Sequence, residues 1–106
     1  MTTAIVAGPD VDGLVSALER AGVQVTRVEG VVTAAVLDDA GVADADLYVL
    51  TDLDEATSIP VAKERNPDVR VVVYSRDSLP EFVRGSADIA MDPDLFAPDM
   101  VADELA

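Results

Sequence analysis

The chain has 106 residues, half of them hydrophobic, and its 21 acidic residues against 7 basic ones give a formal net charge of −14. Acid in this excess on an apolar chain indicates a folded domain with an anionic surface rather than a disordered acidic tail. The composition is typical of a salt-rich cytosol, because molar salt shortens the Debye length to about 3 Å and screens the repulsion. We therefore expect one cytoplasmic, halophilic domain spanning residues 1–106.

Two residue types are missing from the sequence, cysteine and histidine. Their absence excludes disulfides, thiolate nucleophiles, histidine general bases and the usual zinc sites. The six arginines are scattered among acids, so nucleic acid is not expected as a partner. No segment has the ~18 apolar residues that a membrane span requires. The sequence thus predicts a protein that is not an enzyme, has no metal site and does not insert into a membrane.

Short apolar runs alternate with helix-like stretches along the chain. In chain order, we predict a strand at 3–7, a helix at 14–21 ended by Gly22, a strand at 23–28, a short helix between 29 and 46, and a strand at 47–51. A helix with an apolar face at 59–62 follows, where either Ser58 caps a helix that begins near Pro60 or Pro60 kinks the helix. The remaining elements are a strand at 69–75, a short helix at 79–84, a short strand at 89–91 and a closing helix at 98–105.

This order of elements predicts an α/β fold with one doubly wound parallel sheet, because parallel neighbours need crossover connections. The expected strand order is 2-1-3-4-5, a Rossmann-like arrangement. In such a sheet, ligands bind at the carboxyl ends of the first and third strands, where the connections diverge to opposite faces. We therefore look for functional residues in the loops that follow these two strands.

The loop Gly8–Gly13 (GPDVDG) connects the first strand to the first helix, where a dinucleotide-binding fold places its phosphate loop. Its glycines match the first and last positions of GxGxxG, and Asp10 occupies the middle position. Asp12 adds a second negative charge near the helix N-terminus, which disfavours a bound anion. The favoured interpretation is that the two glycines form a tight turn while Asp10 or Asp12 caps the helix.

Further acids are predicted at the same edge of the sheet. Glu29 follows the second strand, where a dinucleotide fold places the acid that binds the ribose hydroxyls, and a solvated surface glutamate is an equal alternative. The run Thr51–Glu55 follows the third strand and carries three carboxylates. Clustered carboxylates can hold Mg²⁺. An anionic surface and the preference of helix N-termini for acids produce the same cluster, so a metal site is the weaker interpretation.

Three segments carry a family resemblance: AGVADADLYVLTD at 40–52, NPDVRVVVYSRD at 66–77 and SADIAMDP at 86–93. They resemble the N-terminal nucleotide-binding domain of TrkA-type potassium-uptake regulators, the RCK or KTN Rossmann family. The resemblance implies a reduced, stand-alone haloarchaeal form of that domain. Some short proteins of this kind are called CTP synthetases, but this chain has no Cys nucleophile and no Gly-Lys-Ser/Thr loop for that chemistry.

What the resemblance implies about function is a regulatory domain that binds NAD(H) or an adenine nucleotide, commonly as a dimer or a larger ring. It places Gly8 and Gly13 in the phosphate turn, with Asp10 at the middle glycine. It also places Glu29 on the ribose, and Thr51 and Asp52 facing the ligand.

A receiver-like signalling module shares the same strand order and is the alternative. Asp10, Asp52 and Ser75 occupy three of the positions that a receiver requires, but Asp92 stands where the lysine belongs. Without that cation a phosphorylated aspartate loses its charge partner. The sequence therefore leaves two hypotheses, a non-catalytic nucleotide-binding regulatory domain and a degenerate receiver that docks a protein without phosphotransfer.

Overall fold

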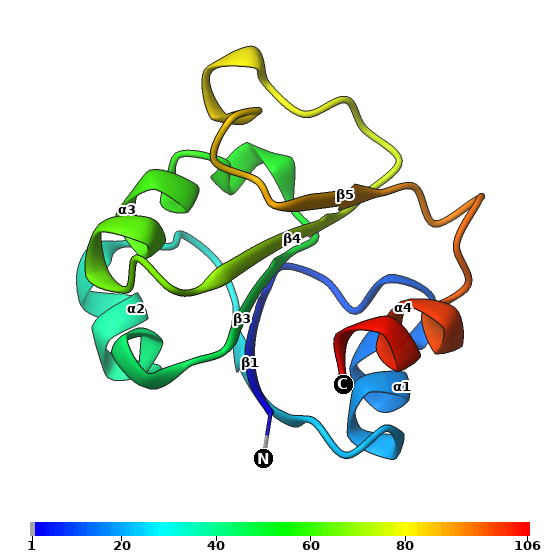
Figure 1. The fold of residues 1–106 in the computed structure, drawn as a ribbon. Helices are drawn as coiled ribbons and strands as arrows, with labels where there is room; N and C mark the ends of the chain where they lie inside the picture. Colours follow the sequence, from blue (N-terminus) through cyan, green and yellow to red (C-terminus); the bar gives the residue numbers. More distant parts are fainter. Residues whose placement is uncertain (1) are drawn as a thin grey trace.

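Strands and helices alternate from Thr3 to Leu105, and the computed structural model describes residues 2–106. The strands are β1 (Thr3–Ala7), β2 (Gln24–Val28), β3 (Leu47–Leu50), β4 (Arg70–Tyr74) and β5 (Ile89–Met91). The α-helices are α1 (Leu14–Arg20), α2 (Ala34–Asp39), α3 (Ser58–Arg65) and α4 (Pro98–Leu105). All four strand pairs are parallel, in the order β2-β1-β3-β4-β5 (Figure 1). The predicted Rossmann-like sheet and its strand order are confirmed.

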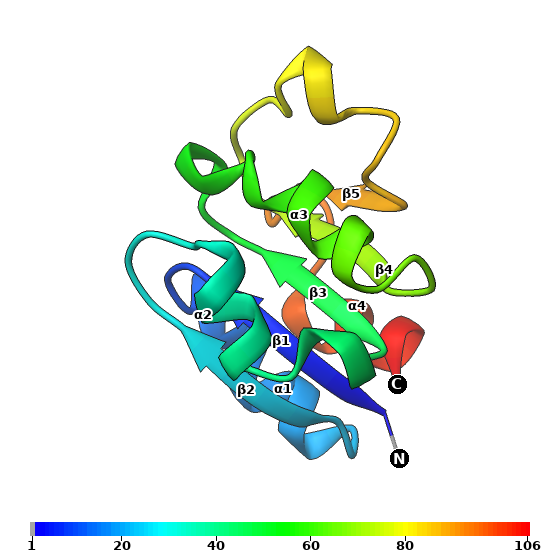
Figure 2. The ribbon, with the colours of Figure 1, turned by 90° about the vertical axis from the view of Figure 1, so that its left-hand side faces the viewer.

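Helices cover both faces of the sheet, with α1 and α4 on one face and α2 and α3 on the other (Figures 1 and 2). Side chains alternate between the faces of a strand. Tyr48 therefore belongs to the core under α2 and α3, whereas its neighbour Val49 belongs to the core under α1 and α4. A strand buried on both faces needs apolar residues at every position, which explains the unbroken runs LYVL and VVVY.

The start of α3 differs from both alternatives that the sequence suggested. The helix begins at Ser58, so Pro60 lies in its first turn, where a backbone N–H has no partner within the helix to lose. Ser58 does not cap the helix. Its side chain is buried and points into the core, where its hydroxyl oxygen Oγ lies 2.6 Å from the Glu55 carbonyl oxygen and 2.6 Å from the Tyr48 hydroxyl.

The connection from β4 to β5 also differs from the prediction. A short helix was expected at 79–84, but the structure has one 3-10 turn, Glu81–Val83, of which only Val83 is buried. Pro80 directly before the turn and Gly85 two residues after it both disfavour a longer helix. Among residues 2–106, no helix combines the length and the hydrophobicity needed to cross a bilayer.

Tyr48 is fully buried, and its hydroxyl bonds the side chain of Ser58. A serine hydroxyl carries one hydrogen, and Ser58 donates it to the Glu55 carbonyl, so Tyr48 is the donor in the Tyr48–Ser58 bond. Burial raises the pKa of Tyr48 to about 12, and the negative charge of Glu55 adds to the rise. The folded state therefore favours the neutral tyrosine.

We predict that the protein loses stability as the pH rises from 10 to 12, because Tyr48 ionises near pH 10 in the unfolded chain and near pH 12 in the folded one. The stabilisation from this group is complete below pH 10 and is lost as the pH rises above it. Its size is about 2–3 kcal/mol at 1.36 kcal/mol per pKa unit.

Urea unfolding over this pH range in a Tyr74→Phe background, which removes the second tyrosine, measures the effect. The additional change Tyr48→Phe should flatten the pH dependence. An equally steep decline in that double variant would contradict the assignment.

Candidate functional site

The loops after β1 and β3 meet at the carboxyl edge of the sheet, as predicted. The Thr51 amide donates to the Ala7 carbonyl at 2.9 Å. The Thr51 hydroxyl lies 2.7 Å from the Pro9 carbonyl and 3.2 Å from the Ala7 carbonyl. Thr51 is itself buried. Its side chain therefore joins the two loops, and its place is inside the edge rather than in an open ligand pocket.

Glycine is needed at position 8 because the β1 and β3 loops approach each other closely there. Its φ of +112° lies where side-chain-bearing residues are strained, and a Cβ there would lie 2.8 Å from the Asp52 amide nitrogen and 2.9 Å from the Asp52 Cβ. No such crowding exists at Gly13, whose φ is +80° and whose Cβ would meet nothing within 4 Å. The first glycine therefore allows the β1 and β3 loops to pack together, and the second allows the turn into α1.

The N-terminal end of α1 is occupied by the protein's own acids. Gly13 holds the N-cap position of α1, and the Asp10 carboxylate accepts a hydrogen bond from the Val15 amide in the first turn at 2.9 Å, so of the two acids predicted to cap the helix Asp10 bonds its N-terminal end. Asp12, with a φ of +53°, accepts from the Arg76 guanidinium at 3.0 Å. The position where a phosphate would lie in a dinucleotide-binding loop therefore already has a carboxylate.

Three of the six predicted ligand residues line one shallow pocket of about 220 Å³. They are Gly8, Glu29 and Asp52, and the pocket is completed by Pro9, Arg27 and Gly30. Asp10, Gly13 and Thr51 do not line it. Arg27, which the sequence analysis did not single out, donates to the Gly8 carbonyl at 3.1 Å and lies 3.8 Å from the Glu29 carboxylate. Arg27 lies near the carboxyl end of β2, opposite the end of β1, and this position could have identified it as a residue of the ligand edge.

Two of the acids after β3 bond backbone amides, Asp52 within its own turn and Glu55 in the loop before α2. Asp52 accepts from the Asp54 amide at 3.0 Å, and Glu55 accepts from the Val32 amide at 2.6 Å. Within residues 2–106, no group of three or more acidic side chains is placed to hold a metal ion.

The receiver-like positions after β4 and β5 behave in the same way as Asp52. Ser75 accepts from the Asp77 amide at 3.1 Å and Asp92 accepts from the Asp94 amide at 2.8 Å. After three successive strands, then, a polar side chain bonds the backbone two residues further on, which is the pattern of an Asx or Ser turn.

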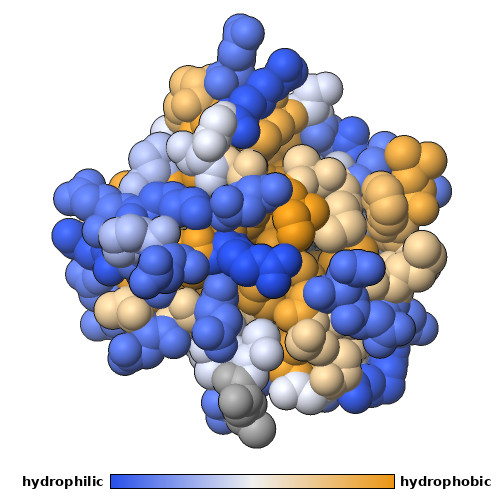
Figure 3. All heavy atoms as spheres, viewed as in Figure 1, coloured by the Kyte–Doolittle hydropathy of each residue, from blue (hydrophilic) through white to orange (hydrophobic). Residues whose placement is uncertain are grey.

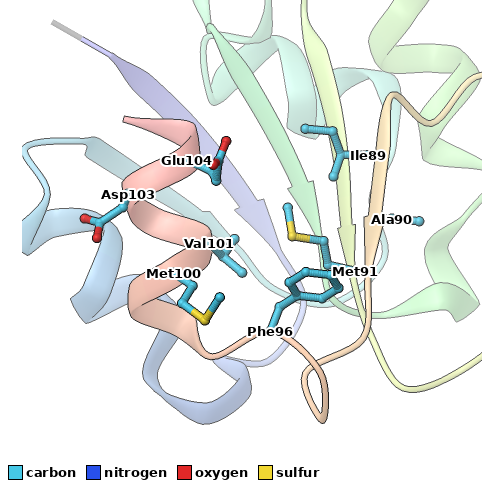
Figure 4. Close-up of a pocket in the computed structure, with 8 residues that line it drawn as sticks. All are labelled: Ile89, Ala90, Met91, Phe96, Met100, Val101, Asp103 and Glu104. Carbon is cyan, nitrogen blue, oxygen red and sulfur yellow. The ribbon is translucent and has the colours of Figure 1, made fainter.

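A second candidate surface lies away from this edge, between β5 and α4 (Figure 4). The groove, which we call the β5–α4 groove, has a volume of about 610 Å³ and is lined by Ile89, Ala90, Met91, Phe96, Met100, Val101, Asp103 and Glu104. Figure 3 shows apolar side chains gathered on this side of the molecule, whereas polar side chains cover the side of α2 and α3. The sequence analysis predicted the strand at 89–91 and the helix at 98–105 but did not predict a groove between them.

The loop that leads from β5 to α4 is fixed at two points. The Tyr74 hydroxyl donates to the Phe96 carbonyl at 2.6 Å, and Arg76 donates to the Asp94 carboxylate at 2.8 Å. The backbone of Phe96 is thus held in place while its side chain is 39% exposed and that of the neighbouring Leu95 is 74% exposed. Phe96 and Leu95 therefore remain exposed although the loop that carries them is hydrogen-bonded to the sheet side.

Comparisons with known proteins agree with the fold and leave the function open. A family model described as a family of unknown function (DUF7126) matches residues 4–105. No curated protein matches the chain.

Two crystal structures of proteins assigned by name to pilus assembly are similar in fold. The one from Burkholderia pseudomallei has a TM-score of 0.71 at 20% identity and covers 99% of this chain and 87% of its own. CpaE from Burkholderia thailandensis has a TM-score of 0.70 at 20% identity, with coverages of 99% and 95%. At this identity the likeness extends to the fold alone.

We predict that Gly8→Ala destabilises the protein by at least about 2 kcal/mol, because the added Cβ collides with the Asp52 backbone in a strained conformation. The matched variant Gly13→Ala has the conformational strain without the collision and should cost about 1 kcal/mol. Urea denaturation of both variants measures the difference. Equal losses would show that the loops separate easily and that the close approach has little energetic weight.

Proposed function

Since the chain belongs to this family of unknown function, we propose from its geometry that it is a non-catalytic docking module that binds a partner protein at the β5–α4 groove. The observation that carries the proposal is the contrast between the two surfaces. The β5–α4 groove has a volume of about 610 Å³ and exposed apolar side chains, whereas the pocket lined by Gly8, Glu29 and Asp52 has a volume of about 220 Å³. Exposed apolar surface of this kind marks interaction sites in soluble domains.

The absence of catalysis is part of the proposal. With no cysteine and no histidine in the sequence, the candidate reactive groups are carboxylates and hydroxyls. At the carboxyl edge, Asp10, Asp52 and Ser75 accept hydrogen bonds from backbone amides, and the Thr51 hydroxyl joins two carbonyls. A nucleophile paired with a base, which covalent chemistry requires, is not formed by these residues.

The fold neighbours support the docking proposal to a limited extent. Both are assigned to pilus assembly, a name that refers to assembly rather than to a reaction. The degenerate receiver suggested by the sequence is also a docking module. Asp52, Ser75 and Asp92 fit such a module because each bonds the backbone two residues further on, and Asp92 stands where a receiver has its lysine.

The nucleotide-binding hypothesis stays as a second candidate because Gly8, Glu29 and Asp52 line one pocket. The glutamate after β2 is then available for ribose hydroxyls, and Arg27 provides the one cation among the lining residues. Asp10 at the helix end disfavours phosphates. The ligand of this candidate is therefore a nucleoside or its monophosphate rather than a dinucleotide.

Thermal-shift measurements with adenosine, AMP, ADP, ATP, CTP, NAD⁺ and NADH, each with and without Mg²⁺, test this second candidate. Binding at 100 times the dissociation constant adds about 2.7 kcal/mol, which raises the melting temperature by several degrees. We expect any shift to come from adenosine or AMP and to disappear in Glu29→Gln. A shift with NAD⁺ or ATP alone would show that the capping by Asp10 does not exclude phosphates.

Site-specific photo-crosslinking in cells tests the docking proposal. A photoreactive residue in place of Met100, which is 57% exposed in the β5–α4 groove, should give a covalent adduct with one protein. Val31 is 71% exposed and lies outside the β5–α4 groove, so the same substitution there serves as the control. The captured protein should then bind the purified domain in calorimetry and fail to bind Met100→Asp. Adducts of equal yield at both positions would contradict docking in this groove.

A further inference from the structure

We infer that the β5–α4 groove binds a cationic amphipathic helix of another protein, an inference that rests on the proposed docking function. The side chains that form its surface come from three elements. Ile89 and Met91 extend from β5, Phe96 from the connecting loop, and Met100 and Val101 from α4. Figure 4 shows Ile89, Met91 and Phe96 directed to the space between strand and helix, while Ala90 points away from it. A continuous apolar surface of this shape fits the apolar face of a helix.

The position of the β5–α4 groove in the layers of the fold favours a helix over a strand. On this face the sheet is covered by α1 and α4, and β5 lies at the sheet edge beyond β4. Ile89 and Met91 pack against this face's core but stay only partly buried. A helix seated beside α4 at the usual interaxial distance of about 8–10 Å would cover them and extend the helical layer. An added strand would instead pair with the three-residue edge of β5 and leave these side chains uncovered.

The residue types in the β5–α4 groove suit an adaptable docking surface. Two of the chain's three methionines, Met91 and Met100, and one of its two phenylalanines, Phe96, line it. Methionine is flexible and polarisable, and it is used often where a surface packs against helices of different sequence. Met100 is 57% exposed and therefore does not serve as a core residue in the free protein.

The charge of the β5–α4 groove selects the partner. Asp103 and Glu104 belong to its α4 wall, and Figure 4 shows the Asp103 carboxylate directed to the far side of the helix, so Glu104 is the nearer charge. Among residues 2–106, neither of these carboxylates makes an ion pair. A second copy of the chain would bring a net charge of −14 towards another −14, which opposes self-association at moderate salt. A helix with Lys or Arg beside its apolar stripe would instead find opposite charges at this wall.

Titrations with designed helical peptides of about 15 residues test the inference, at an ionic strength of about 0.15 M. The probe has leucines at i, i+3, i+4 and i+7 with lysines on both flanks of that stripe. A second peptide has glutamate at each lysine position, and a third has the first composition in scrambled order. We expect only the first to bind in calorimetry and to shift the NMR signals of Met91, Phe96 and Met100.

Matched variants separate the β5–α4 groove from the general charge of the protein. Met100→Asp should weaken binding at least about tenfold, and Asp103→Asn with Glu104→Gln should weaken it at least about threefold. The control, Asp39→Asn with Glu64→Gln, removes two exposed charges from α2 and α3 on the opposite face and should leave affinity unchanged. An equal loss in the control, or equal binding of the scrambled peptide, would overturn the inference.

The remaining outcomes distinguish this inference from the proposed function. If the glutamate peptide shifts the signals of the β5–α4 groove as strongly as the lysine peptide, the docking proposal stands and the cationic partner is wrong. If no peptide shifts these signals and the crosslinking from position 100 also fails, both are wrong. If the free protein sediments as a dimer that Met100→Asp dissociates, the occupant is a second copy and the inference is overturned.

Discussion

The contact between the carboxyl ends of β1 and β3 determines the shape of the edge at which Rossmann-like folds hold ligands. Gly8 lies against the Asp52 backbone, and the buried Thr51 hydroxyl links the Ala7 and Pro9 carbonyls. With the loops held in this relative position, the polar side chains that follow satisfy nearby backbone amides. The edge is therefore stabilised by the groups that would otherwise be available for chemistry, and the open apolar surface of the molecule lies elsewhere, on β5 and α4.

Arg76 connects these two regions. It follows β4 and bonds the carboxylates of Asp12 in the β1–α1 loop and Asp94 in the β5–α4 loop. Its hydrogen bonds to both acids raise the pKa of the guanidinium, which stays charged at any pH of interest. All three side chains are substantially exposed, so each ion pair contributes little to stability. Arg76 thus bridges the loop at the ligand edge and the loop that bears Phe96.

The sequence was sufficient to predict the sheet because four strands have apolar runs, β2 has β-branched residues between polar ones, and each turn has its Gly, Pro or Asp. It also predicted that the Gly8 and Thr51 loops converge and that either Asp10 or Asp12 bonds the start of α1, of which Asp10 does so. The position of Ser58 was not predictable, because its hydroxyl bonds Tyr48, which a local pattern does not relate to it. The β5–α4 groove was missed for a similar reason. A local pattern does not show how many helices cover a face of the sheet, and the exposure of Met91 and Met100 depends on that number.

The edge position of β5 affects how stability is distributed in the molecule. Local opening requires least free energy where few apolar contacts must be broken. All four residues of β3 are buried, whereas in β5 two are partly buried and one is exposed, and β5 pairs with a strand on one side only. The backbone amides of β5 should therefore exchange with solvent through smaller fluctuations than those of β3. A molecule that settled on this end of the sheet would slow that exchange, so occupancy could be followed by deuterium uptake in a three-residue segment.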